Sequence, residues 1–270
     1  MTKTLGDRMK EYESITDASL YHRMPIILRI DGRAFHTLTS FMEKPFDDNF
    51  INLMNNTMVE VFNSFPDATL GYVQSDEISI LMCPYATYET EPVFGARIQK
   101  ISSVAASIAT QAFIKNLYNM TQSNETKEWA EKCLKGNISF DCRCFNLPKE
   151  EVINYFRFRQ RDCTRNSILN AGHFYIGKKK CHGFKTPDII EALNTKGIDY
   201  WTTWPNYVHY GRSCYRGEDG HTKLWTIVYG ADQVVQAVDK MVDFNYENRS
   251  EYVNPTLKAS KAIISGKTLL

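Results

Sequence analysis

The sequence predicts an α+β fold in which an antiparallel sheet carries helices on one face. Three observations support this prediction. Short apolar and β-branched runs of strand length recur in the first 145 residues. Two longer segments between them repeat apolar residues at helical spacing. The resulting order is strand, helix, strand, strand, helix, strand, which is typical of the ferredoxin-like arrangement.

The first strand and the first helix have clear boundaries. Residues 26–31, IILRID, form a β-branched run that predicts a buried strand. Residues 47–65 place apolar side chains at helical spacing. Asp47 and Asp48 favour a helix N-terminus at the start of this segment, and Pro66 ends it.

The other elements follow in order. Residues 69–74 and 77–83 are two apolar runs with two polar residues between them, which predicts a hairpin. Residues 95–120 predict an amphipathic helix, and residues 138–145, ISFDCRCF, predict another strand. A polar helix is expected over about 148–168, and short aromatic and basic segments follow it, so the composition of the chain changes after residue 146.

This change indicates how the chain is divided. We expect a first domain over residues 1–135, and a second over 136–270 that completes the sheet and adds an α/β C-terminal extension. The formal net charge is only +1, so a nucleic-acid partner would need a local basic surface. No apolar run is long enough to span a bilayer, and the N-terminus is polar, so we expect a cytoplasmic protein without membrane contact.

The seven cysteines are odd in number and contain no CxxC pair, which indicates reduced thiols. The spacings of Cys142 with Cys144 and of Cys181 with His182 are poorer than those of structural zinc sites. Buried or unreactive thiols are therefore the favoured interpretation, with zinc as the alternative.

The strand order brings acidic residues together. In a ferredoxin-like sheet the first and third strands are antiparallel neighbours. Asp31 ends the first strand, and Asp76 and Glu77 begin the third, so their carboxylates should converge. Such a group is tolerated around divalent cations, and Mg²⁺ prefers carboxylates, backbone carbonyls and phosphate oxygens. Taken separately, the Asp-Gly pair at 31–32 and the SDE stretch at 75–77 are each also an ordinary turn signal.

Several cations could bind phosphate near these acids. Arg33 and His36 follow Gly32 in a turn that could surround a phosphate. Arg97 and Lys100 fall in the first turns of the predicted 95–120 helix, where the macrodipole disfavours them unless an anion binds. Lys44 is a similar candidate, and a solvated helix face is the alternative for these cations.

The second half contains a local basic surface that indicates RNA binding. Arg157, Arg161 and Arg165 form one stripe of the 148–168 helix, and such stripes neutralise phosphates. Residues 200–216 mix aromatic residues with arginines, which indicates either base stacking or core packing. The further candidates for RNA contact are Arg159, Asn166, Lys178, Lys179 and Lys180.

These residues resemble those of a known superfamily. The segments RIDGRAFH, EKP, YVQSDEISI, FDCR and FRQRDC are similar, in this order over about residues 1–170, to the tRNA-His guanylyltransferase superfamily. The resemblance implies a polymerase-like palm that adds nucleotides to RNA 5′ ends. It also implies two Mg²⁺ ions, ATP that activates a 5′-monophosphate, GTP or another nucleoside triphosphate as the added unit, and a homo-oligomer, often a tetramer.

The resemblance also implies roles for individual residues. Asp31 and Asp76 match metal-binding aspartates, and the carbonyl of Gly32 matches a backbone ligand. Glu77 matches the adjacent acidic residue, which we expect to be catalytic with the two aspartates. The residues that match the nucleotide-binding segments are Gly32, Arg33, Ala34, Phe35, His36, Ser75, Arg97 and Lys100.

One segment departs from the family. Residues 164–171 read TRNSILNA where the family has HINNLYNT, so only Asn166 and Asn170 match and Thr164 replaces a histidine. The sequence therefore resembles the guanylyltransferase-like branch, which implies template-dependent 3′-to-5′ addition that repairs tRNA 5′ ends. The alternatives are G addition to tRNA-His, a palm-type nucleotidyl cyclase, and a non-enzymatic RNA-binding module.

Overall fold

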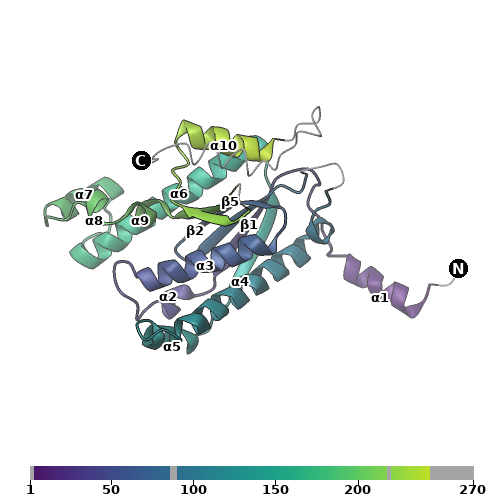
Figure 1. Ribbon diagram of the computed structural model, residues 1–270, viewed down its shortest axis with the longest axis horizontal. Coiled ribbons are helices and arrows are strands. Elements are labelled where there is room, and N and C mark those ends of the chain that lie inside the picture. The colour runs from purple at the N-terminus through teal and green to yellow at the C-terminus, as the bar shows by residue number, and fades with distance from the viewer. Residues whose placement is uncertain (1–2, 86–89, 218–219, 244–270) are drawn as a thin grey trace.

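The computed structural model describes residues 3–85, 90–217 and 220–243, and Figure 1 shows a sheet between layers of helices. The strands are β1 (Ile26–Gly32), β2 (Ala68–Gln74), β3 (Glu77–Met82), β4 (Phe140–Asn146), β5 (Arg212–Arg216) and β6 (Thr222–Trp225). The helices are α1 (Leu5–Ser14), α2 (Phe35–Leu38), α3 (Asp48–Ser64), α4 (Ile98–Met120), α5 (Lys127–Leu134), α6 (Lys149–Gly172), α7 (Thr186–Asn194), α8 (Tyr200–Thr203), α9 (Asn206–Tyr210) and α10 (Asp232–Val242). Short 3₁₀ and π segments cover Val93–Ala96 and His173–Gly177.

The strands form one sheet in the order β4-β1-β3-β2-β5-β6, with every neighbouring pair antiparallel. The first four strands have the predicted ferredoxin-like order, with β1 and β3 as central neighbours. The second half of the chain contributes β4 at one edge and β5 and β6 at the other. The sheet therefore runs across the expected boundary at residue 135, and that division stays a prediction.

Helices cover both faces of the sheet, so the expectation of helices on one face is wrong. On one face, α3 and α4 pack Phe62 and Phe113 against Leu28. On the other face, α6 and α10 pack residues such as Phe156 against Ile27 (Figure 1). The physical reason is that every residue of β2 and β3 is buried, and successive side chains of a strand point to opposite faces.

The helix boundaries differ from the sequence prediction at two places. The helix expected from residue 95 begins at Ile98, because residues 94–96 have φ values of 55°, 62° and 59°. Arg97 is therefore the N-cap and lies outside α4. The 148–168 helix continues to Gly172. Across the described ranges, no helix combines the length and the apolar content that a membrane span requires.

Candidate functional site

The backbone brings Asp31, Asp76 and Glu77 to the same end of the sheet, as the strand order predicts. Asp31 lies opposite Glu77 in the β1–β3 register. The Gly32 amide donates a hydrogen bond of 3.1 Å to the carbonyl oxygen of Asp76. This bond joins the end of β1 to the turn between β2 and β3, so two residues 44 positions apart become neighbours.

The electrostatics of the two aspartates favour a bound cation. Burial raises the pKa of Asp31 above its ordinary value, and the carboxylates of Asp76 and Glu77 raise it further. Burial also raises the pKa of Asp76. Keeping both side chains ionised therefore costs free energy, which a nearby cation would offset.

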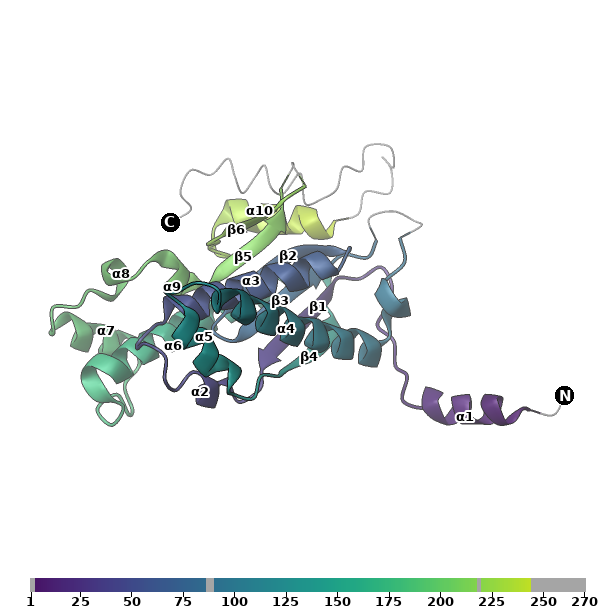
Figure 2. The same ribbon diagram turned by 60° about the horizontal axis from the view of Figure 1, so that its bottom comes forward.

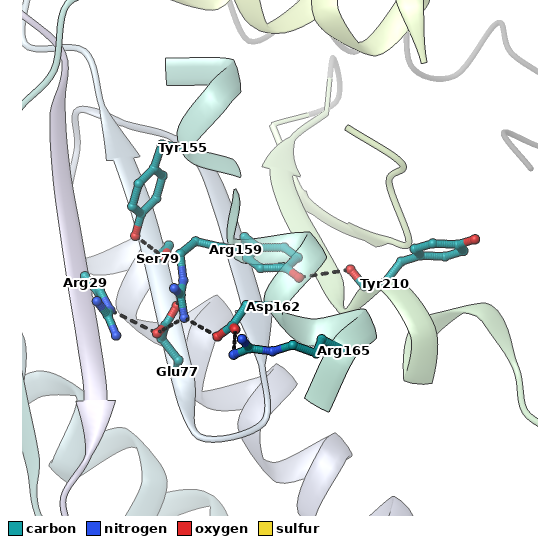
Figure 3. A network of polar contacts seen from close by, with 9 residues as sticks. Arg29, Glu77, Ser79, Tyr155, Arg159, Asp162, Arg165 and Tyr210 are labelled. Atoms are coloured by element: carbon teal, nitrogen blue, oxygen red, sulfur yellow. Dashed lines mark hydrogen bonds and ion pairs between the residues drawn. The ribbon is translucent and has the colours of Figure 1, made fainter. Parts of the chain in front are cut away.

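Glu77 occupies a different environment from the two aspartates. Arg159 donates to both of its carboxylate oxygens, with distances of 2.6 Å from Nε to Oε1 and 2.6 Å from Nη2 to Oε2. Arg29 Nε donates to Oε2 at 2.9 Å. Figure 3 shows these bonds and their continuation through Asp162 to Arg165. Since both oxygens are engaged by arginines, the structure does not support a direct catalytic role for Glu77, which stays a prediction.

The same network corrects the prediction for Arg159. Its side chain is only 6% exposed, so it is not available to an RNA phosphate. The residue lies on the face of α6 that packs on the sheet, where an arginine is stable only with a carboxylate partner. The expectation of RNA contact at Arg159 is therefore wrong.

A cavity of about 470 Å³ lies beside the aspartates. Its volume is within the range of small-molecule sites. Gly32 and Asp76 lie in its wall, while Asp31 adjoins them. Its wall also includes Ala34, Phe35, His36, Glu43, Lys44, Asp47, Asn55, Ser75, Asn166, Asn170, Tyr207, Gly211 and Arg212.

The segment after β1 is shaped to pass close to this cavity. A Cβ at Gly32 would lie 2.6 Å from the Phe35 ring, so only glycine fits there. Ala34 has a φ of 57°, which turns the chain into α2. Phe35 packs against Phe113 and Phe140 with ring centroids 5.4 and 5.0 Å away, and so anchors the segment. Arg33 and His36 remain exposed.

Lys44 and Ser75 lie at the cavity, as the phosphate prediction requires. The exposed Lys44 ammonium donates to the carbonyl of Thr39 at 3.1 Å. Ser75 is exposed in the β2–β3 turn with a φ of 48°. Both residues therefore line the same cavity as Asp76 and are open to a ligand.

Arg97 and Lys100, in contrast, are not brought to this cavity. The start of α4 lies beside β4 at Cys144, whose thiol contacts the carbonyl of Ile98 at 3.5 Å. The carboxylate end of the sheet lies beside Thr110, which accepts a hydrogen bond of 3.2 Å from the Phe140 amide. At a rise of 1.5 Å per residue, Ile98 and Thr110 are about 20 Å apart along α4. Figure 2 shows α4 running alongside β4.

The two cations have local partners at that far end. Arg97 pairs with Asp17 at 3.6 Å, and the Lys100 ammonium lies 5.4 Å from the centre of the Phe94 ring. They line a second hollow with residues of α1. Contact of these two side chains with a nucleotide stays a prediction that this chain's own cavity does not support.

The basic surface of α6 is only partly as expected. Arg157 is half-buried and donates to the carbonyl of Tyr229 at 2.9 Å. Arg161 and Arg165 are exposed, and Arg165 also pairs with Asp162. Lys178, Lys179 and Lys180 are exposed in the turn after the π segment. These five exposed cations can reach RNA, and their contact with it stays a prediction.

Sequence reasoning missed several residues of the cavity wall. Asn166, expected at the RNA surface, lines the cavity together with Asn170. Their i, i+4 spacing on one helix face was the available signal. Asn55, Tyr207 and Arg212 also line it, and no local motif distinguishes them in the sequence.

Three comparisons with known proteins give consistent results. A family model described as tRNAHis guanylyltransferase matches residues 6–148. The structure of a bacterial tRNA(His) guanylyltransferase-like protein in complex with ATP gives a TM-score of 0.80 at 33% identity, covering 89% of this chain and 100% of that one. A structure with GTP gives a TM-score of 0.68 at 30% identity, covering 90% and 100%. The tRNA(His) guanylyltransferase of Schizosaccharomyces pombe is 31% identical over 72% of this chain and 68% of its own length.

The matched family model covers more than half of the 270 residues, and the matched segment includes Asp31, Asp76 and the β2–β3 turn. The bacterial structures extend the likeness to most of the chain. The chain therefore belongs to the tRNAHis guanylyltransferase family and is a nucleotidyltransferase that binds nucleotides and acts in tRNA processing.

Proposed function

We propose that this chain adds a nucleotide to the 5′ end of a tRNA in the 3′-to-5′ direction. The observation that supports this most is the convergence of Asp31, Gly32 and Asp76 beside a nucleotide-sized cavity. In the proposed reaction, the 5′-monophosphate of the RNA attacks the α-phosphorus of ATP and releases pyrophosphate. The 3′-hydroxyl of GTP or another nucleoside triphosphate then attacks the activated 5′-phosphate and releases AMP.

The donor set at the aspartates fits Mg²⁺. Among the described residues, no three acidic, histidine or cysteine side chains converge as a ready-made metal site. Two carboxylates of raised pKa and a backbone carbonyl are nevertheless what Mg²⁺ uses when phosphate and water complete its shell. Asp31, Asp76 and Gly32 would hold it, and the ion would supply stabilisation of phosphoryl charge.

The other residues of the site would orient the substrates. The segment from Gly32 to His36, with Lys44 and Ser75, adjoins Asp76 and could hold a polyphosphate. Arg161, Arg165 and the lysines at 178–180 are placed on the outside, where they could neutralise the RNA backbone.

Two finer activities fit this proposal. The names of the relatives favour addition of G to tRNA-His, which we take as the first candidate. The second is template-directed addition to 5′-truncated tRNA, and one observation favours it. Thr164, in the place of the family's histidine, donates to the carbonyl of His209 at 2.8 Å and so offers no imidazole to a tRNA-His determinant.

The experiment supplies 5′-monophosphorylated tRNAs that lack their first nucleotide, with ATP, Mg²⁺ and each nucleoside triphosphate in turn. The base opposite the missing position is varied, and full-length tRNA-His is tested in parallel. G added only to tRNA-His, whatever lies opposite, supports the first candidate. An added base that follows the opposite base supports the second. No addition to any tRNA, with a cyclic product from the nucleotide alone, contradicts the proposal.

A further inference from the structure

The chain before β5 forms a rigid wall of the cavity. Thr164 Oγ1 donates to the carbonyl of His209 at 2.8 Å. The carbonyl of Tyr210 accepts from Gln160 Nε2 at 3.0 Å and from the Tyr72 hydroxyl at 3.1 Å. These three bonds fix the segment to α6 and β2. A side chain that follows it is therefore held in position before any ligand arrives.

Gly211 sets the direction in which the chain enters β5. Its φ is 72°, and a Cβ there would lie 2.6 Å from the carbonyl oxygen of Val73. Arg212 is the next residue and pairs with Val73 on β2. Val73 is three residues before Asp76 in the sequence, and Arg212 lines the same cavity as Asp76.

The Arg212 guanidinium has an incomplete set of partners. It lies 4.6 Å from the centre of the Tyr207 ring, which holds it in place. The Tyr207 hydroxyl in turn donates to Asp48 at 3.2 Å. Within the described part of the chain, Nε of Arg212 is buried without a hydrogen-bond acceptor, and no carboxylate forms an ion pair with this guanidinium. A guanidinium without a carboxylate partner keeps hydrogen-bond donors that a bound anion can use.

The acids of the cavity wall do not supply that acceptor. Asp47 accepts from the amides of Phe50 and Glu43 and from the Trp129 indole. The other two acids of the wall, Glu43 and Asp76, form no ion pair with Arg212. A planar guanidinium with free donors is the side chain best suited to phosphate oxygens.

We propose that Arg212 binds a phosphate group inside the cavity. The proposal rests on the proposed function, because both substrates of that reaction carry phosphate: the nucleoside triphosphate and the 5′ end of the RNA. The Tyr207 ring acts with Arg212 by keeping the guanidinium oriented.

The test measures binding without turnover, by equilibrium dialysis of ATP and GTP with Mg²⁺ and by filter binding of one tRNA with a 5′-phosphate or a 5′-hydroxyl. Arg212→Gln removes the charge, and Arg212→Lys keeps the charge but loses the planar fork. Arg216→Gln is the matched control, since Arg216 lies on the same strand, packs over Phe62 and does not line the cavity. Thermal unfolding of each variant verifies that it is folded.

We expect Arg212→Gln to weaken binding by about 10- to 100-fold, with a smaller loss in Arg212→Lys and none in the control. A loss for ATP and GTP alike assigns the site to the triphosphate. A lost preference for 5′-phosphate over 5′-hydroxyl RNA assigns it to the RNA end. Unchanged binding of all ligands, or a loss confined to one base, overturns the proposal. If wild-type protein binds ATP through Arg212 yet adds no nucleotide to tRNA, the proposed function fails and the phosphate site stands.

Discussion

At the scale of single residues, Glu77 and Arg159 show how the site end of the sheet is stabilised. Each side chain is 6% exposed, and the pair shares two hydrogen bonds. The pair joins α6 to the strand that begins beside Asp76. Breaking a buried pair by removing one partner leaves a charge without compensation, which costs more than the pair contributes.

We therefore expect Arg159→Met to lower the free energy of unfolding by about 3–5 kcal/mol, measured by urea denaturation. Arg165→Met is the control, because Arg165 also pairs with Asp162 but is 62% exposed. Its loss should be about 0–1 kcal/mol. Equal losses in the two variants would show that burial of the Glu77 pair does not matter.

His209 gives a prediction about pH. Its ring is buried, and Nε2 donates to the carbonyl of Trp204 at 2.9 Å while Nδ1 has no partner among the described residues. Burial lowers the pKa of His209 below its ordinary value of 6.5. Below pH 6.5 the unfolded state therefore binds a proton that the folded state does not, and the free energy of unfolding falls.

Urea denaturation at a series of pH values should show this fall between neutral pH and about pH 5. In His209→Gln the fall should be smaller, whereas substitution of the exposed His182 by glutamine should leave it unchanged. A pH dependence that is identical in all three proteins would contradict a neutral His209.

At the scale of elements, the start of α3 joins three segments. Asp47 caps the helix by accepting from the Phe50 amide at 2.9 Å. It also accepts from the Glu43 amide and from the Trp129 indole, both at 3.0 Å. The side chain thus connects α3, the segment with Lys44, and α5.

Asp47→Ala should lower the free energy of unfolding by about 1–3 kcal/mol, because a cap and two further bonds are lost. Asp47→Asn retains one acceptor oxygen and should lose less. The comparison is made by thermal unfolding, and an alanine variant as stable as the wild type would exclude the capping role.

The four strands and the two long helices of the first 146 residues could be predicted because each has a local signal, whereas the shorter helices α1, α2 and α5 were not predicted. Apolar runs identified β1 and β3, and Asp47 and Pro66 bounded α3. The meeting of Asp31 with Asp76 followed from strand order alone. The position of Arg97 could not be predicted from strand order or local patterns. Residues 94–96 have a left-handed backbone conformation that the sequence does not reveal, and this conformation moves the start of α4 to Ile98.

At the scale of the whole molecule, the second face of the sheet depends on the C-terminal half. The Phe156 ring of α6 stacks on Tyr229 with ring centroids 5.1 Å apart. It also lies edge-on to Tyr72 of β2, with ring centroids 6.4 Å apart. Sequence periodicity could not show this layer, since α6 is polar overall and its partners come from distant segments. The cavity wall at Arg212 depends on the same long-range packing.

Phe156→Ala should therefore cost about 3–5 kcal/mol of unfolding free energy, as for other buried phenylalanines. Phe158→Ala, two residues along the same helix and 59% exposed, should cost about 1 kcal/mol or less. Urea denaturation distinguishes the two, and a small loss at Phe156 would mean that α6 does not help to hold the sheet.

The central claim is that Asp31 and Asp76 carry the nucleotide-addition chemistry. The most direct measurement is incorporation of a labelled nucleotide into 5′-monophosphorylated tRNA by Asp31→Asn, Asp76→Asn and a control, Asp67→Asn, whose half-buried carboxylate lies at the opposite end of β2. We expect the first two variants to lose at least about a hundredfold in rate with unchanged unfolding midpoints, and the control to retain activity. Incorporation at the wild-type rate by either of the first two variants would contradict the account.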